Sequence, residues 1–197
     1  MFKSKKSRVR AIAVVGMAAV AAGIGTVTYQ ASAAEVAARP GPPAPGFSVP
    51  LIPDAIKPPA GSHPIGVFAV AKGTQNYTCV VPDGATTGAY TGASVPEAQL
   101  IGTGGRIHHF GGPSWQSLRD GSLVTAAKVS SSPRTGAVPE LLLKVATHTG
   151  AGILTNADYI NRLATSGGVA PTGTCTAGQT VNVPYNAVYV FWDAPAA

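Results

Sequence analysis

The stretch that decides the fold is Val181-Asn-Val-Pro-Tyr-Asn-Ala-Val-Tyr-Val-Phe-Trp192, near the end of the chain. Every second residue from Val181 to Phe191 is apolar or aromatic, and this period of two predicts a β-strand with one buried face. Pro184 interrupts the run and removes one backbone donor. The strand is therefore expected at the edge of a sheet or with a bulge near Pro184.

Shorter apolar runs precede this strand, and turns rich in Gly, Pro and Asp separate them. The runs predicted as strands are Ile65–Ala71, Gln75–Val81, Ala98–Ile101, Arg106–Phe110, Leu123–Val129, Leu141–Ala146 and Tyr159–Leu163. Helical alternatives stay open at Val138–Thr147 and Ala157–Ala164. Many short strands without βα alternation predict a mainly β fold, a single-domain antiparallel β-sandwich or barrel with long loops and at most short helices.

The first 33 residues have the pattern of a signal peptide. Five basic side chains lie within residues 3–10, an uncharged apolar run follows from Ala11 to Val27, and Ala31-Ser32-Ala33 fits a cleavage site. A membrane anchor is the alternative, although the run is at the short end of the range for a spanning helix. The pattern predicts a secreted, extracellular protein.

Residues 34–64 contain nine prolines, which disfavour helices and central strands. We expect residues 34–48 to be a disordered Pro-rich arm and residues 49–193 to be one β-rich domain. The apolar residues Val49, Leu51, Ile52 and Ile56 predict that the chain lies against the domain from residue 49 onward.

Charge excludes one class of partner. The chain has 14 Lys and Arg and 8 Asp and Glu, but five of the basic residues lie in residues 1–33, which leaves nine basic and eight acidic residues after cleavage. No basic surface then remains to neutralise phosphates, so nucleic-acid binding is not expected. No membrane contact after signal cleavage is expected, and the protein is expected to be a monomer.

The two cysteines, Cys79 and Cys175, are expected to form one disulfide, because disulfides persist in exported proteins. Two reactive or metal-binding thiols are the alternative. Neither cysteine belongs to a CxxC motif or stands beside a histidine.

Signatures of catalysis are missing from the sequence, including HExxH, GxSxG and the P-loop, and no cofactor is expected. His108 and His109 are neighbours on a predicted strand, so their side chains point to opposite faces. They cannot then bind one metal ion together without a bulge, and no metal is expected.

Three further residues need interpretation, and two of them allow more than one. Trp115 follows Gly111-Gly112-Pro113 and is either a core residue or a stacking platform for sugar rings. Arg162 either anchors loop carbonyls or contacts an anion, and we expect it to be structural. Asp120 precedes Gly121 and has the position of a turn residue.

Several motifs together resemble one protein family. They are Gln75-Asn-Tyr77-Thr-Cys79, His109-Phe-Gly-Gly-Pro113-Ser-Trp115 with Asp120-Gly121-Ser122, Leu141-Leu-Leu143, the segment from Tyr159 to Pro171, and Tyr185-Asn-Ala187-Val-Tyr189-Val-Phe191. With these motifs the chain resembles domain of unknown function 3455, and the resemblance extends over about residues 49–193. The resemblance carries no established activity. It raises His109, Trp115, Asp120 and Arg162 as candidate binding residues.

Two hypotheses of function follow. The first is a non-catalytic cell-surface or extracellular binding module, with a cell-wall or extracellular glycan as one ligand class. The alternative is an exported enzyme, with or without a metal ion, built around His109, Asp120 and Arg162. Convergence of these three side chains in an open cleft would favour the enzyme.

Overall fold

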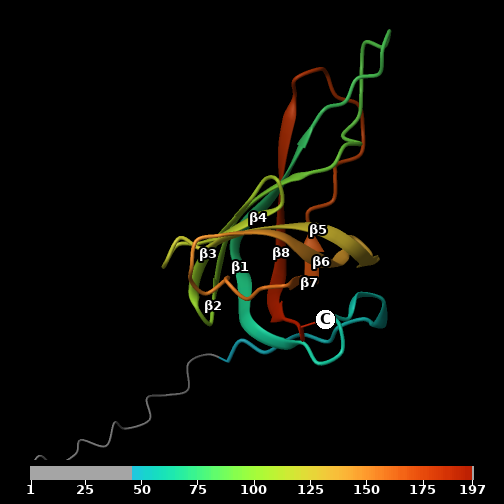
Figure 1. Ribbon diagram of the computed structural model, residues 1–197. Coiled ribbons are helices and arrows are strands. Elements are labelled where there is room, and N and C mark those ends of the chain that lie inside the picture. The colour runs from blue at the N-terminus through green and yellow to red at the C-terminus, as the bar shows by residue number, and fades with distance from the viewer. Residues whose placement is uncertain (1–45, 197) are drawn as a thin grey trace, which may run out of the picture. The chain divides into compact units, whose positions relative to one another are not determined.

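Eight strands make up the fold in the computed structural model, which describes residues 46–196 (Figure 1). They are β1 (His63–Thr78), β2 (Val95–Gly102), β3 (Gly105–Phe110), β4 (Ser114–Ser117), β5 (Leu123–Ser132), β6 (Glu140–Thr149), β7 (Tyr159–Gly167) and β8 (Thr180–Asp193). A single 3₁₀ turn, η1 (Asp54–Ile56), precedes them within the described residues. The predicted signal peptide and most of the Pro-rich arm lie outside these residues.

The strands form a closed antiparallel barrel. Each strand pairs with the next along the chain, and β8 returns to pair with β1. The mainly β prediction is confirmed, and the barrel is the correct one of its two forms. Because β8 is paired on both sides, Pro184 does not lie on an edge strand. It lies next to an irregularity instead, because the β1–β8 register breaks between Ala69 and Thr74, and Thr74 pairs with Pro184.

β1 unites two of the predicted strands. Its register against β2 shifts between Val70 and Lys72, where Ala71 has no partner in β2. Such a bulge bends a strand and increases its twist, so one long strand can follow the barrel wall and continue beyond it. The sequence between the two apolar runs resembles a turn because the bulge interrupts the period of two.

Two other expectations need correction. Both helical alternatives are wrong, because Val138–Thr147 and Ala157–Ala164 lie mostly within β6 and β7. The short strand β4 was not predicted, because Trp115 is its single large apolar residue and Gly111-Gly112-Pro113 precedes it. No helix within residues 46–196 is long and apolar enough to cross a membrane.

The barrel buries apolar residues on both sides of its wall. Tyr185, Tyr189 and Phe191 of β8 belong to the interior cluster, as the alternation predicts. Val190 and Trp192 face outward and pack under the segment that precedes β1, where Ile56 is fully buried. Phe47, Val49 and Ile52 also pack there, whereas Leu51 is 93% exposed.

Hydrogen bonds attach this segment to the outside of the barrel. Asn161 Nδ2 donates to the Ile56 carbonyl at 2.8 Å, and Trp192 Nε1 donates to Asn161 Oδ1 at 2.9 Å. The buried amide of Asn161 therefore satisfies a backbone carbonyl and an indole that would otherwise be unpaired.

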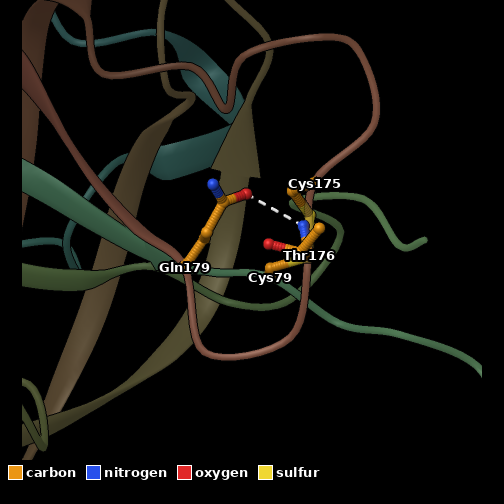
Figure 2. The surroundings of a disulfide bond; sticks show 4 residues. All are labelled: Cys79, Cys175, Thr176 and Gln179. Atoms are coloured by element: carbon orange, nitrogen blue, oxygen red, sulfur yellow. Dashed lines mark hydrogen bonds between the residues drawn. A yellow bond between two sulfur atoms is a disulfide. The ribbon is translucent and has the colours of Figure 1, made fainter. Parts of the chain in front are cut away.

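One end of the barrel continues into an extension, made by the end of β1, the start of β8 and the loops 79–94 and 168–179 (Figure 1). The Cys79–Cys175 disulfide joins these loops (Figure 2), which confirms the predicted pair. Two hydrogen bonds flank it, from Cys79 N to the Gln179 carbonyl and from Thr176 N to the Gln179 side-chain Oε1, both 2.8 Å. A bond closing a 96-residue separation contributes at most about 4.7 kcal/mol in the chain-entropy model.

Candidate functional site

The up-and-down topology gives the barrel two ends with different contents. The first end collects the end of β1, the start of β2, the β3–β4 turn and the starts of β6 and β8. A partly open cavity of about 100 Å³ lies there. Its lining residues come from every strand except β5 and from the segments before β2 and β4: Gln75, Ser94, Pro96, His109, Pro113, Trp115, Leu141, Leu143, Arg162 and Tyr189.

The β3–β4 hairpin positions His109 and Trp115. The two residues are directly opposite each other in the register, and their rings stack with centroids 4.3 Å apart and planes 6° apart. The turn between them contains Gly112 with a φ of 86°, a conformation that disfavours other residues. Tyr189 of β8 meets both rings edge-on. The hairpin thus fixes a packed aromatic group against the cavity.

His109 is a neutral imidazole in this setting. Its Nδ1 lies 2.9 Å from the Ser114 carbonyl, an acceptor, so Nδ1 carries the proton and donates. The side chain is 2% exposed, and this burial lowers its pKa to about 3, against a smaller opposing effect of the Ser114 bond. The nearby charge of Arg162 lowers the pKa further. His109 therefore adds no charge to the cavity at neutral pH.

Strand register places Arg162 inside the barrel. Arg162 pairs with Leu141 of β6 on one side and with Tyr189 of β8 on the other, and all three line the cavity. Its Nε and Nη2 donate to the Pro139 carbonyl at 3.1 and 2.8 Å. The side chain is close enough for its charge to lower the pKa of Tyr189 against the stronger raising effect of burial.

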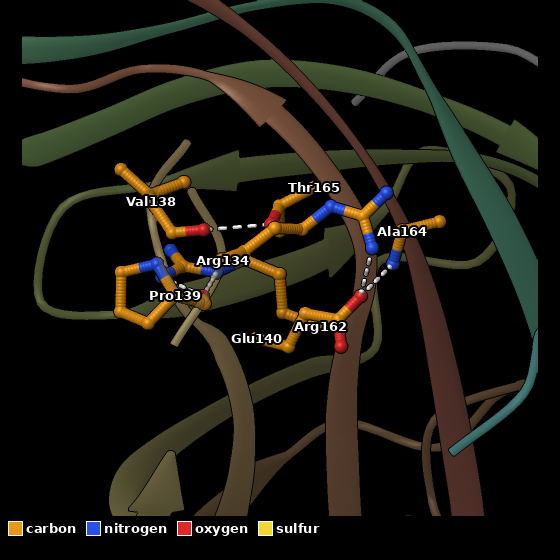
Figure 3. Close-up of polar contacts among 7 residues, drawn as sticks. All are labelled: Arg134, Val138, Pro139, Glu140, Arg162, Ala164 and Thr165. Atoms are coloured by element: carbon orange, nitrogen blue, oxygen red, sulfur yellow. Dashed lines mark hydrogen bonds and ion pairs between the residues drawn. The ribbon is translucent and has the colours of Figure 1, made fainter. Parts of the chain in front are cut away.

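The buried carboxylate of Glu140 bonds to partners other than Arg162 (Figure 3). Glu140 Oε1 accepts from Ala164 N at 2.6 Å and from Arg134 Nη1 at 3.2 Å. The first bond stabilises a bulge in β7, where Ala164 has a φ of 49°. Next to it, Thr165 Oγ1 donates to the Val138 carbonyl at 2.6 Å. No ion pair joins Glu140 to Arg162 within the described residues.

Two side chains that line the cavity carry a buried donor that makes no hydrogen bond within the described residues, although Gln75 lies close enough to Tyr185 to lower the pKa of its hydroxyl against the raising effect of burial. The donors are Trp115 Nε1 and Gln75 Nε2, each on a side chain that is 1% exposed. The other side of the Gln75 amide is satisfied, because Ser94 Oγ donates to Oε1 at 2.5 Å. Unpaired buried donors are rare in folded proteins, and each one asks for an explanation.

Asp120 lies at the opposite end of the barrel. Its Oδ1 accepts from Ser122 N and Ser122 Oγ at 3.1 and 2.7 Å, and its Oδ2 accepts from Ile153 N at 3.1 Å. The Ser122 hydroxyl is the main cause that lowers the Asp120 pKa to about 2. These bonds join the β4–β5 turn to the loop between β6 and β7. The residue is a turn and loop anchor.

Of the four candidate residues, the structure brings together His109, Trp115 and Arg162 and leaves Asp120 apart. His108 points outward to Glu97, with 2.7 Å between Nε2 and Oε1, so the two histidines diverge as expected. The Trp115 ring is buried, which favours its interpretation as a core residue over a sugar platform. Among residues 46–196, no three His, Cys, Asp or Glu side chains gather to form a metal site.

Sequence reasoning missed Gln75, Ser94 and Tyr189 as cavity residues. Tyr189 was on the predicted interior face of β8, and Gln75 lay within the first motif of the family resemblance. Neither signal separates a cavity residue from a core residue. That difference depends on which strands meet at the open end.

Comparison with known proteins gives one match. The model of a family described as "Protein of unknown function (DUF3455)" matches residues 103–193. The match covers the segment from His109 to Phe191 and begins after the Gln75–Cys79 motif. No curated protein and no solved structure matches the chain.

Proposed function

We propose that this chain, whose residues 103–193 belong to the DUF3455 family, is an exported, non-catalytic protein that binds a small molecule in the open end of its barrel. The partly open cavity, lined by side chains from separate strands that include a cation and two carriers of unpaired donors, carries the proposal. Eight-stranded barrels have interiors wide enough for one small ligand, and barrel mouths are common binding sites.

The polar groups at the cavity suit binding better than proton transfer. A general base works best with a pKa near the working pH, whereas the pKa of His109 is about 3. Asp120, the acid of the enzyme hypothesis, is bonded to Ser122 and Ile153 at the other end. The three residues of that hypothesis therefore do not share one cleft, and binding is the better supported function.

The size and shape of the cavity favour a small molecule over a glycan chain. Trp115 is stacked on His109 and buried, so it has no open face for a sugar ring. Export is supported by the signal-like residues 1–33 and by the Cys79–Cys175 disulfide, which would persist outside the cytoplasm.

A ligand screen on a filled cavity tests the proposal. We would record ligand-observed NMR spectra of a library of small polar molecules with the wild-type chain, with Leu141→Phe and with Leu118→Phe. Leu141 is half-buried and lines the cavity, whereas Leu118 is 54% exposed and follows β4 at the opposite end. We expect ligands that bind the wild type and Leu118→Phe but lose binding to Leu141→Phe. A library without such ligands, or equal binding by both variants, contradicts the proposal.

A further inference from the structure

We infer that the cavity takes a small organic carboxylate whose anionic group meets Arg162. The inference rests on the proposed function and names its ligand class. It depends on three observations: the charge of the cavity, its unpaired donors and its apolar walls.

Arg162 is the single charged residue in the cavity lining, and no acidic residue is among the lining residues. The acidic partners of ion pairs within the described residues are Asp54, Asp193, Glu97 and Glu140, and none pairs with Arg162. His109 is neutral. A half-buried guanidinium without a counter-ion favours one negative charge from a ligand.

Arg162 has hydrogen-bonding capacity left for such a ligand. A guanidinium has five N–H donors, and the Pro139 carbonyl accepts from two nitrogen atoms, Nε and Nη2. The hydrogen bonds to Pro139 leave Nη1 unused, and the guanidinium also lies close to the Tyr189 hydroxyl. The carbonyl bonds fix the direction of the side chain, so the structural role expected for Arg162 and a role in binding are compatible. Planar carboxylates match the planar fork of an arginine.

The unpaired donors point to the same chemistry. Trp115 and Gln75 each carry an N–H group without a partner, and leaving such a group buried and unpaired is unfavourable. A ligand rich in acceptor oxygens can remove that cost, whereas a cation or a donor-rich ligand cannot. The acceptor oxygens of a carboxylate combine this property with the required charge.

The apolar residues that line the cavity indicate that the ligand has a hydrocarbon part in addition to its anionic group. Leu141, Leu143, Pro96 and Pro113 line the cavity beside the polar groups. A volume of about 100 Å³ limits the ligand to a compact molecule, because one water alone occupies roughly 30 Å³ of liquid. Inorganic phosphate would leave these walls without an apolar partner and would bring up to two negative charges to one cation.

Isothermal titration calorimetry with matched probes tests the inference. The probes are 3-methylbutanoate, its neutral amide 3-methylbutanamide, and inorganic phosphate, each titrated into the full chain at pH 7. We expect the carboxylate to bind at least tenfold more tightly than the amide or phosphate. Equal binding of carboxylate and amide overturns the anionic class and leaves the proposed function intact. Binding of phosphate alone overturns the organic class, and binding of none overturns the ligand class for this cavity.

Arginine variants locate the charge. Arg162→Met should reduce carboxylate affinity at least tenfold and leave amide affinity within twofold. Arg134→Met is the matched control, because Arg134 pairs with Glu140 and does not line the cavity. Carboxylate binding that survives Arg162→Met in a folded protein contradicts the assignment.

A second variant covers the case in which Arg162→Met does not fold. Gln75→Glu has nearly the same shape but places a carboxylate in the cavity, where it competes for Arg162. We expect carboxylate binding to fall at least tenfold and amide binding to stay within threefold. An equal fall for both probes would show a loss of shape, not of charge, and would contradict the inference.

Discussion

The two ends of the barrel differ in how they satisfy their polar groups. At the end with Asp120, the carboxylate, the Ser122 hydroxyl and the backbone of the loop before β7 bond to one another, and Leu154 and Ala157 of that loop are buried. At the end with Arg162, the cation has no acidic partner among the described residues, and two buried donors there have no protein partner. At the first end the polar groups bond to one another. At the second end polar groups stay unpaired, and we propose that a ligand pairs with them.

This contrast has a thermodynamic consequence. Polar groups that are buried and fully paired contribute to stability, whereas unpaired ones reduce it until a partner binds. Changes at the Asp120 end should therefore alter stability and leave binding unchanged. Changes at the Arg162 end should alter binding, pH dependence or both.

The largest effect on stability is expected from Leu154→Ala, at the end of the barrel with Asp120. Leu154 is 1% exposed and belongs to the interior cluster, so truncation leaves a cavity. We expect the free energy of unfolding to fall by about 2–5 kcal/mol, measured by urea denaturation. Leu118→Ala, at an exposed leucine near the same end, should change it little. A loss smaller than about 2 kcal/mol would contradict the conclusion that this loop packs into the barrel core.

A smaller effect on stability is expected from lowering the pH, through His109 at the end of the barrel with Arg162. The pKa of His109 is about 3 in the folded protein and ordinarily 6.5, so the unfolded chain binds a proton first as pH falls. The stability that this neutral histidine contributes is complete above pH 6.5 and decreases by up to about 1.4 kcal/mol per pH unit below it. Urea denaturation between pH 6.5 and 5.5 measures the slope, in a range that lies about one unit or more above the pKa of ordinary carboxylates, which is about 4.

Variants assign that slope to one side chain. His109→Phe keeps an aromatic ring against Trp115 and should remove most of the slope. His108→Gln, on the outward face of the same strand, should retain it because His109 is unchanged. Equal slopes in the wild type and His109→Phe would contradict the assignment.

The smallest effect is expected from Ser122→Ala. The Ser122 hydroxyl donates to Asp120 Oδ1 and accepts from Leu154 N at 3.3 Å, so its removal leaves a buried backbone donor unpaired. We expect a loss of about 1 kcal/mol in the free energy of unfolding, by urea denaturation. Affinity for 3-methylbutanoate should stay within twofold of wild type. A tenfold loss of affinity would mean that the two ends are not independent.

The strand content and the buried face of each strong strand could be predicted from the sequence. The alternation from Val181 to Phe191 gave the interior side of β8 because a strand has a period of two whatever surrounds it. The divergence of His108 and His109 was predictable for the same reason, and the disulfide followed from there being two cysteines. Where local signals were weak, at β4 and at the Ala71 bulge, sequence reasoning failed.

Which side chains share a site depends on the closed barrel and could not be predicted from local patterns. Arg162 lies beside Tyr189 and near His109 because β7 pairs with β8 and the barrel closes, contacts that join residues far apart in the chain. Asp120 is separated from them because an up-and-down barrel sends alternate turns to opposite ends. A sequence pattern records local periods and turns, whereas a site depends on strand order, register and closure, which are set by packing of the whole chain.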